Sequence, residues 1–258
     1  MMNEKPKLYT AKSPQEPICM THEDALTTLQ QGVVEDVHGM MRWGSNYTFL
    51  VTIHDECNHF MAIYKPRQGE RPLWDFPTGT LCQRETASFV LSEMLNWHLV
   101  PPTVLREGPR GIGSVQVFID HNPNQHYFTF EENQKTQAQR MAVFDAVINN
   151  ADRKGGHCIL DEDDYLWGID HGLTFHPTPK LRTVIWDFAG EPIPDDLLED
   201  LRMLCIQLEQ PEQPDLRQLE QLLTEAELRA LRRRIDHLIQ TGTYPIPGPG
   251  PNRPWPAV

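Results

Sequence analysis

The stretch that decides the fold is Asn149-Asn150-Ala151-Asp152-Arg153-Lys154-Gly155-Gly156-His157, just past the middle of the 258-residue chain. It lies between an apolar helical pattern and a short apolar run at 158–160. After the next apolar run comes a second acidic turn, Gly168-Ile169-Asp170-His171-Gly172. This order predicts a loop that carries an acid–base residue, then a β-hairpin, and then a metal-binding acid.

The two acidic turns are expected to meet in space. An aspartate such as Asp152, in a polar loop after a helix, is most often a cap or a turn residue. Here Arg153 follows it directly, His157 precedes an apolar run, and Asp170 follows the partner of that run. Because a hairpin returns the chain on itself, we expect Asp170 to lie near His157. A carboxylate and an imidazole at such a place suit a divalent metal, although Mg²⁺ prefers oxygen ligands.

The composition disfavours some classes of partner. The net charge is −13, with only 23 lysines and arginines, so long-range repulsion acts against nucleic acids and anionic membrane surfaces. No apolar run approaches the ~18 residues of a membrane span, and the polar N-terminus predicts no signal peptide. Five widely spaced cysteines are typical of reduced thiols. We therefore expect a cytoplasmic protein with no nucleic-acid partner and no stable membrane insertion.

The first half of the chain is rich in strand-like segments. A loose arm is expected over residues 1–20, followed by a short helix at 23–31. Segments rich in β-branched and aromatic residues predict an antiparallel meander whose third strand ends at Lys65 (33–42, 46–54 and 59–65). A Pro- and Gly-rich loop, an amphipathic helix and two further strands follow (66–80, 84–98, 103–106 and 114–120).

The second half is mainly helical. Helical patterns at 136–150, 195–209 and 225–240 accompany the hairpin at 158–169, and the chain closes with an extended Pro-rich tail. A β-rich half followed by a helical half predicts an α+β protein of two lobes. The expected division is an N-terminal arm (1–22), an N-lobe (23–120), a C-lobe (121–244) and a Pro-rich tail (245–258).

The parts that phosphoryl transfer requires occur in order along the chain. This chemistry needs a metal that bridges phosphates, a lysine that holds them, and a carboxylate that aligns or deprotonates the acceptor hydroxyl. Lys65 ends a strand, and Glu85 opens the next helix and could pair with it. Taken singly, Lys65 could be a solvated strand end, and Glu85 could be a favourable charge in a first helical turn. Their shared order with Asp152, His157 and Asp170 favours a common site.

Two motifs carry a resemblance to a known family. The stretches NNADRKGGHCIL (149–160) and WGIDHGLTF (167–175) resemble the catalytic and metal-binding loops of the phosphatidylinositol 3-/4-kinase superfamily. The nearest likeness is to the type II phosphatidylinositol 4-kinases and to a bacterial branch of the superfamily. The stretch AIYKP (62–66) resembles the family's phosphate-binding lysine strand. The resemblance covers roughly residues 30–258 and implies a two-lobed protein-kinase-like fold.

The resemblance implies a role for each matching residue. Asp152 would be the catalytic aspartate, and Arg153, Lys65 and Glu85 join it among the predicted catalytic residues. Asp170 would bind the metal together with His157, which stands where the family has an asparagine. The implied cofactors are ATP and Mg²⁺ or Mn²⁺. The remaining predicted nucleotide contacts are a phosphate-covering turn at Gly44, Ser45 and Asn46, and an adenine-binding hinge at Gln116, Val117, Phe118 and Ile119.

The acceptor and the exact reaction stay open at this point. The segment that would recognise an acceptor, residues 173–186, carries only Lys180, Arg182 and His176 as basic residues. A protein hydroxyl or a small polar molecule is therefore expected rather than an anionic phosphoinositide. The first hypothesis is an ATP-dependent kinase that transfers the γ-phosphate to this hydroxyl. The same cleft would suit an AMP transferase or a nucleotide-binding pseudokinase, and a metal-dependent hydrolase could use Asp152, His157, Asp170 and His171.

Overall fold

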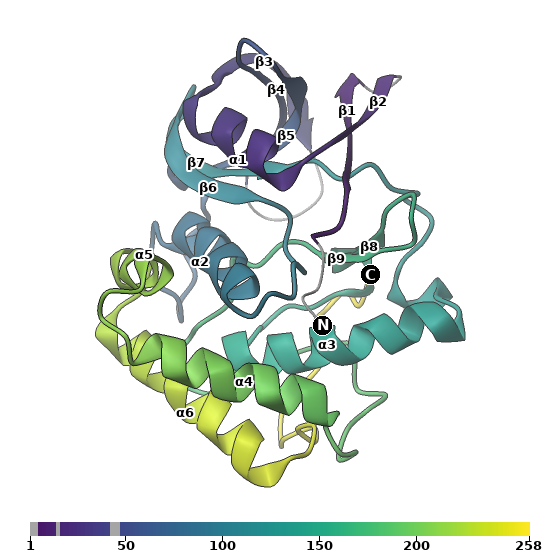
Figure 1. Cartoon of the computed structure of the whole chain (residues 1–258), viewed down its shortest axis with the longest axis vertical. Coiled ribbons are helices and arrows are strands. Elements are labelled where there is room, and N and C mark those ends of the chain that lie inside the picture. Colours follow the sequence, from purple (N-terminus) through teal and green to yellow (C-terminus); the bar gives the residue numbers. More distant parts are fainter. Residues whose placement is uncertain (1–4, 14–15, 42–46) are drawn as a thin grey trace.

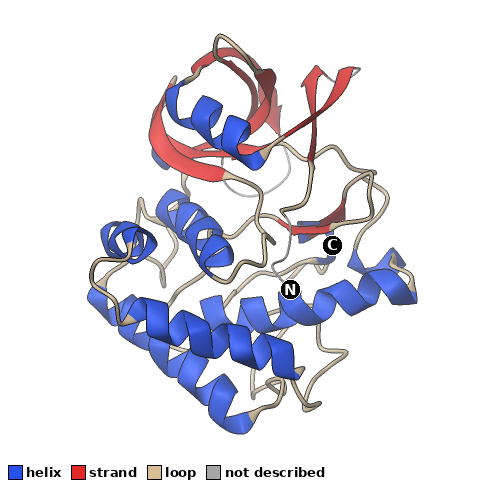
Figure 2. Cartoon of the chain, viewed as in Figure 1, coloured by secondary structure: helices blue, strands red, loops and turns tan. Residues whose placement is uncertain are grey.

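The structure is a computed structural model that describes residues 5–13, 16–41 and 47–258. It has a β-rich lobe above a helical lobe (Figure 1), and the large sheet lies wholly in the upper lobe (Figure 2). The predicted α+β fold with a β-rich N-lobe and a helical C-lobe is therefore confirmed. The turn at Gly44, Ser45 and Asn46, which the sequence predicts to cover phosphates, lies outside the described residues.

The N-lobe is built on a five-stranded antiparallel sheet with the order β3-β4-β5-β7-β6. Phe49, Val51, Phe60 and Ala62, at alternate positions of β4 and β5, are buried in the N-lobe core, because every second side chain of a strand points to the same face of the sheet. The order β3-β4-β5 confirms the predicted meander. Lys65 lies near the end of β5 and pairs with Ser114 of β7. The strands are β3 (Val33–Met41), β4 (Thr48–His54), β5 (His59–Pro66), β6 (Thr103–Gly108) and β7 (Gly111–Val117).

The N-terminal residues form a hairpin in place of the loose arm that was expected. Strands β1 (Leu8–Ser13) and β2 (Glu16–Met20) pair antiparallel. Leu8 is fully buried in the N-lobe core, and the Tyr9 carbonyl accepts the N–H of Asp120 at 2.9 Å. The prediction failed because both strands are short and mix apolar with polar residues. Helix α1 (His22–Gln31) follows and matches the predicted short helix, with Thr21 as its N-cap accepting the Asp24 N–H.

Helix α2 (Leu81–Met94) connects the two lobes. It ends before the predicted end at residue 98, because Asn96 and His98 adopt left-handed φ values of 53° and 50°. Although α2 follows the first strands in sequence, its apolar residues Ala87, Val90 and Leu91 belong to the hydrophobic core of the helical lobe. The helix is buried on nearly every side, so the amphipathic pattern predicted for it is not observed.

An ion pair attaches α2 to the C-lobe. Arg84 of α2 bonds to Glu227 of α6 (Glu225–Thr241), and both side chains are buried. Arg84 also donates through Nη1 to the Thr174 carbonyl at 2.5 Å. Buried charges are retained only where they are paired and hydrogen-bonded. The first turn of α2, which contains Glu85, is therefore fixed to the helical lobe.

The C-lobe is built from helices around the short hairpin of β8 (Cys158–Leu160) and β9 (Leu166–Gly168). The predicted hairpin is confirmed, with Ile159 opposite Trp167. The helices α3 (Glu132–Ile148), α4 (Asp195–Leu208) and α6 match predicted helices, whereas α5 (Pro214–Leu222) was missed. Pro214 occupies the first turn of α5, a position that proline favours because its missing N–H has no partner there.

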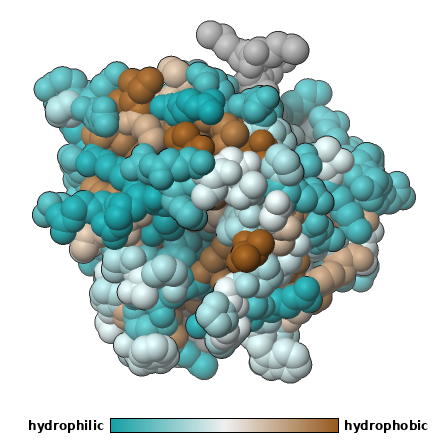
Figure 3. Space-filling view, turned by 90° about the horizontal axis from the view of Figure 1, so that it is seen from below, coloured by the Kyte–Doolittle hydropathy of each residue, from teal (hydrophilic) through white to brown (hydrophobic). Residues whose placement is uncertain are grey.

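Short 3₁₀ helices and loops complete the described chain. The 3₁₀ turns are η1 (Arg67–Gly69), η2 (Tyr127–Thr129) and η3 (Gly155–His157). Seen from below, the helical lobe presents a mainly hydrophilic surface with small separate hydrophobic patches (Figure 3). Within the described residues, every helix is too short or too polar to cross a bilayer.

Candidate functional site

Two asparagines shape the loop after α3. Asn149 ends the helix in the left-handed conformation, with φ 54°, which asparagine tolerates better than most residues. Its side-chain amide donates to two carbonyls in the 176–178 turn at 2.8 Å each and accepts the N–H of Lys180 at 2.8 Å. The buried side chain of Asn150 accepts the N–H of Asp152 at 3.0 Å. The side chains of these two asparagines therefore fix the start of the loop that carries Asp152.

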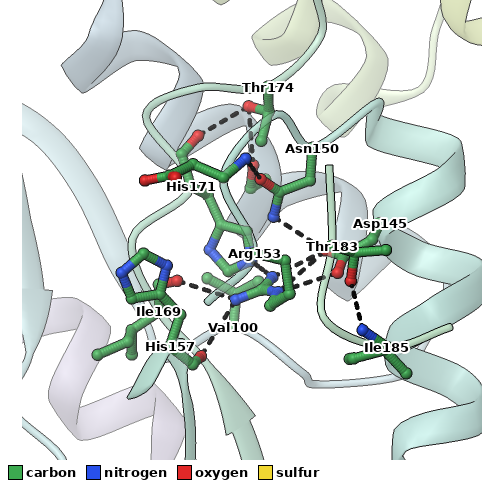
Figure 4. Close-up of polar contacts among 12 residues, drawn as sticks. Val100, Asp145, Asn150, Arg153, His157, Ile169, His171, Thr174, Thr183 and Ile185 are labelled. Carbon is green, nitrogen blue, oxygen red and sulfur yellow. Dashed lines mark hydrogen bonds and ion pairs between the residues drawn. The ribbon is translucent and has the colours of Figure 1, made fainter. Parts of the chain in front are cut away.

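Arg153 lies at the centre of a network of polar contacts with Asp145, His157, Ile169 and His171 (Figure 4). Its guanidinium is fully buried and pairs with Asp145 of α3, also fully buried, at 2.9 Å. It further donates to the carbonyls of His157 and Ile169 at 3.1 and 3.0 Å and to His171 Nε2 at 2.6 Å. Burial opposes the charge, but Asp145 raises the pKa of Arg153 above its usual value. Arg153 thus joins the two loops through its hydrogen bonds, and its predicted place among the catalytic residues stays a prediction.

Asp145 was missed in the sequence. It is the only acidic residue between positions 136 and 150, and it lies among the apolar side chains of α3. A lone carboxylate on a helix face that is otherwise buried requires a partner, because an unpaired buried charge is strongly unfavourable. That signal was present in the sequence, and it pointed to a buried basic residue nearby.

Asp152, His157 and Asp170 converge on one point. Each offers a ligand atom, and these atoms all lie within 4.8 Å of one another. The hairpin brings His157 Nε2 to 3.3 Å from Asp170 Oδ2, so the two turns meet as their order in the sequence predicts. Asp170 has a left-handed φ of 59°. Burial lowers the pKa of His157 to about 4, so its imidazole is neutral at pH 7 and has a nitrogen lone pair available.

Lys65 lies at the same point from the N-lobe side. Its Nζ is 2.5 Å from Glu85 Oε1 and 2.8 Å from Asp170 Oδ1. The second oxygen of Glu85 accepts the N–H of His171 at 2.9 Å. Although burial opposes both charges, the attraction between them raises the pKa of Lys65 and holds that of Asp170 far below its usual range. A cation and an acid from different lobes are therefore both ionised across the cleft.

The carboxylate of Asp152 has a different character. It is half-buried, with Lys154 Nζ 3.3 Å from its Oδ2. Burial raises the pKa of Asp152 to about 6, while the Lys154 charge opposes the rise. A carboxylate with a pKa near neutrality can accept a proton from a hydroxyl that is being consumed and later release it. The arrangement is suited to general base chemistry.

The predicted hinge runs along the end of β7. The Gln116 side chain donates to Thr103 Oγ1 at 2.8 Å and is buried. The N–H groups of Val117 and Phe118 donate to the carbonyls of Pro102 and Met61 at 3.0 and 3.1 Å, so these two amides are already bonded within the protein. The His121 ring lies 2.7 Å from the Ile119 carbonyl. The role of residues 116–119 toward adenine remains a prediction, and it would have to use other groups than these amides.

A β-rich lobe and a helical lobe, with a lysine–glutamate pair facing an acidic cluster across the junction, define a kinase-like phosphotransferase. Within this class, the chain belongs to the phosphatidylinositol 3- and 4-kinase family, whose model matches residues 12–240. Protein Rv2133c of Mycobacterium tuberculosis is 38% identical over 86% of this chain and 91% of its own length.

Two solved structures are similar to this chain. A structure of hydra Fam20 with sugar has a TM-score of 0.50 and 14% identity, over 85% of this chain and 87% of that one. The Helicobacter pylori proinflammatory kinase CtkA has a TM-score of 0.48 and 12% identity, over 82% and 93% of the two chains. The likeness to hydra Fam20 supports the two-lobed kinase-like fold and extends no further.

Proposed function

We propose that the protein is an ATP- and divalent-metal-dependent kinase that transfers the γ-phosphate of ATP to a hydroxyl of an acceptor. One observation carries the proposal: Asp152, His157 and Asp170 converge within 4.8 Å, and Lys65 contacts Asp170 at 2.8 Å from the other lobe. Phosphoryl transfer requires a metal-binding acid, a phosphate-binding lysine and a carboxylate for the hydroxyl, all within one cleft.

The donor atoms fit a divalent cation. Two carboxylates and a neutral imidazole provide oxygen and nitrogen ligands, a set that Mn²⁺ accepts more readily than Mg²⁺ does. Asp170 and His157 would hold the cation, which neutralises phosphate charge when bound. Lys65, oriented by Glu85, would hold the phosphates of ATP. Asp152 would accept the proton of the acceptor hydroxyl, as its pKa of about 6 allows.

The surroundings of Lys180 favour an acceptor other than a phosphoinositide. Lys180 Nζ is 2.8 Å from Asp75 Oδ2 and lies over the Trp74 ring, 5.1 Å from its centroid. A lysine already paired with a carboxylate attracts an anionic headgroup less than a free lysine does. The ring of His176 lies against Phe76 at 5.2 Å. These contacts support a protein hydroxyl or a small polar molecule as the acceptor class.

Binding is tested first, by thermal shift with ATP in the presence and absence of Mg²⁺ or Mn²⁺. A ligand specific for the native state raises stability by roughly 2.7 kcal/mol at 100 times its Kd. We expect a metal-dependent rise for the wild type, abolished in Asp170→Ala and retained in Glu162→Ala, a control on the exposed hairpin turn. If no combination of nucleotide and metal raises the thermal stability of the wild type, both the kinase proposal and any nucleotide-binding role are refuted.

Turnover then separates the reactions that share this cleft. Incubation with [γ-³²P]ATP or [α-³²P]ATP should label an acceptor only from the γ-position. Asp152→Asn should lower this labelling by about 10²-fold or more while ATP binding is retained. Labelling from the α-position would identify an AMP transferase. Metal-dependent binding without transfer in the wild type would identify a pseudokinase.

A further inference from the structure

The Pro-rich tail turns back to the catalytic loop. The Ala257 carbonyl accepts the N–H of Gly155 at 2.7 Å, and Gly155 lies between Asp152 and His157 in the sequence. A Cβ added at Gly155 would lie 3.0 Å from the Phe128 ring and 3.4 Å from the Ala257 carbonyl. The loop backbone, the aromatic ring and the tail therefore fit closely, with no room for a side chain between them.

A second contact joins the tail to the segment that follows the metal-binding turn. The Asn252 carbonyl accepts the N–H of Thr183 at 3.2 Å and the indole N–H of Trp186 at 3.0 Å. Thr183 is itself paired with Arg153 of the catalytic loop through a β-bridge, in which the Val184 N–H donates to the Arg153 carbonyl at 3.1 Å. The tail, the 182–186 segment and the catalytic loop thus share one hydrogen-bonded backbone network.

The tail is held by backbone carbonyls and one proline rather than by its large side chains. Pro254 is buried between the two contacts, whereas Trp255 is 92% exposed. The frequent prolines of residues 245–256 restrict the unbound chain, so less conformational entropy is lost when the tail is ordered. Its anchored part is residues 252–257, which we call the C-terminal strap.

We propose that the C-terminal strap positions the catalytic loop for phosphoryl transfer. The strap bonds to Gly155, inside the stretch that carries Asp152 and His157, and to the segment that pairs with Arg153. Small displacements of catalytic groups reduce rates strongly, by about 10²-fold for about 1 Å. Lys65 and Glu85, which would hold ATP, lie on β5 and α2, where Lys65 is bonded to Glu85 and to Asp170 rather than to the strap. The strap therefore sets kcat and leaves ATP affinity nearly unchanged; this inference rests on the proposed kinase function.

The test compares three variants with the wild type. Deletion of residues 250–258 removes both contacts, Trp186→Phe removes only the indole donor, and Trp255→Ala is the matched control at the exposed indole. We expect the deletion to lower kcat by about tenfold or more and to change the ATP Kd less than threefold. Trp186→Phe should lower kcat by about fivefold, as expected for one lost hydrogen bond. Trp255→Ala should leave kcat unchanged.

Rescue and hydrogen exchange distinguish positioning from a general effect on folding. A synthetic peptide of residues 249–258, added to the deletion variant, should restore kcat in a saturable manner. Amide exchange followed by mass spectrometry should accelerate over 152–158 and 182–186 in the deletion variant, and not in the core of α3. An unchanged or increased kcat would overturn the proposal, as would an equal loss of ATP binding or exchange that accelerates throughout the molecule.

These readouts separate failure of the strap from failure of the kinase proposal. If the wild type transfers no phosphate, the proposed function fails. The hydrogen-exchange data alone then test whether the strap positions the catalytic loop. Local acceleration over 152–158 on deletion supports it, and unchanged exchange there refutes it.

Discussion

His157 is the main difference between this site and the pattern of the family that the sequence resembles. Its partly buried, neutral imidazole faces Asp170 at 3.3 Å, at the position where the resemblance leads one to expect an asparagine oxygen. Nitrogen donors favour the later transition metals over Mg²⁺, which prefers oxygen and an octahedral shell. We therefore expect this one side chain to influence which cation the proposed site binds.

Replacing His157 should change the metal preference. We expect His157→Asn to shift the ratio of Mn²⁺-supported to Mg²⁺-supported turnover toward Mg²⁺ by about tenfold, because an amide oxygen replaces the nitrogen donor. Turnover with limiting metal, together with Mn²⁺ binding followed by electron paramagnetic resonance, measures the change. His59→Asn, an exposed position at the start of β5, is the control. An unchanged ratio in His157→Asn would show that the ring does not contact the cation.

Asp152 and Lys154 predict a pH dependence. Burial raises the pKa of Asp152 to about 6, and the Lys154 charge opposes that rise. The base must be unprotonated, so kcat/KM should increase as the pH rises through about 6 and then level off. Lys154→Met removes the opposing charge, so the midpoint should move to higher pH. A midpoint that stays fixed or moves lower would contradict the assignment of Asp152 as the base.

At the scale of elements, α3 and the two acidic loops form one unit through Arg153 and Asp145. Both side chains are fully buried, so removing one leaves the other charge unpaired in the interior. We expect Arg153→Met to lower the free energy of unfolding by about 3–5 kcal/mol, measured by urea denaturation. The double variant Arg153→Met/Asp145→Leu should recover most of that stability. Turnover should stay low in the double variant, because nothing then holds the carbonyls of His157 and Ile169 together.

The elements that the sequence predicts well are those that local pattern determines. The meander up to Lys65, the hairpin at Ile159 and Trp167, and the approach of Asp170 to His157 follow from alternation, turn residues and chain reversal. The hairpin β1–β2 was missed because its strands are short and mix apolar with polar residues. Helix α5 was missed although Leu216, Leu219 and Leu222 recur at helical spacing. Burial of the whole of α2 was missed for another reason: periodicity cannot show that a second lobe covers the polar side of a helix.

The parts of the candidate site that the sequence could not predict depend on contacts between distant parts of the chain. Asp145 was visible as a lone acid on an apolar helix, but its partner Arg153 was assigned to the cleft because the motif contains it. The bond from Gly155 to the Ala257 carbonyl has no sequence signal, since backbone groups make it and any residue could supply the oxygen. Likewise, the internal hydrogen bonds of Val117 and Phe118 depend on the path of neighbouring loops.

At the scale of the whole molecule, His22 joins elements of the two lobes. It begins α1 and lies over Trp167 of β9, with ring centroids 6.0 Å apart, and it is 4% exposed. Burial lowers its pKa from 6.5 to about 4. Between these values the unfolded chain binds a proton that the native state does not, so stability falls as the pH drops from about 6.5 toward 4.

Replacing His22 should remove part of this acid sensitivity. We expect the wild type to lose more stability than His22→Gln between pH 7 and pH 5, by on the order of 1–2 kcal/mol. Urea denaturation of both proteins at the two pH values gives this difference directly. Comparing the two losses cancels the contributions of other titrating groups. Equal losses would show that His22 is not the group responsible.

The pair of Arg84 with Glu227 has a consequence for inhibitor chemistry. Many kinases are controlled by movement of the helix whose glutamate pairs with the phosphate-binding lysine. Here that helix, α2, shares the core of the helical lobe, and its first turn is bonded to α6. A compound that pushed α2 outward would have to separate two buried charges and open an apolar core. Selective compounds for this protein are therefore better sought among ligands of the cleft or of the surface around residues 252–257 than among those that displace a helix.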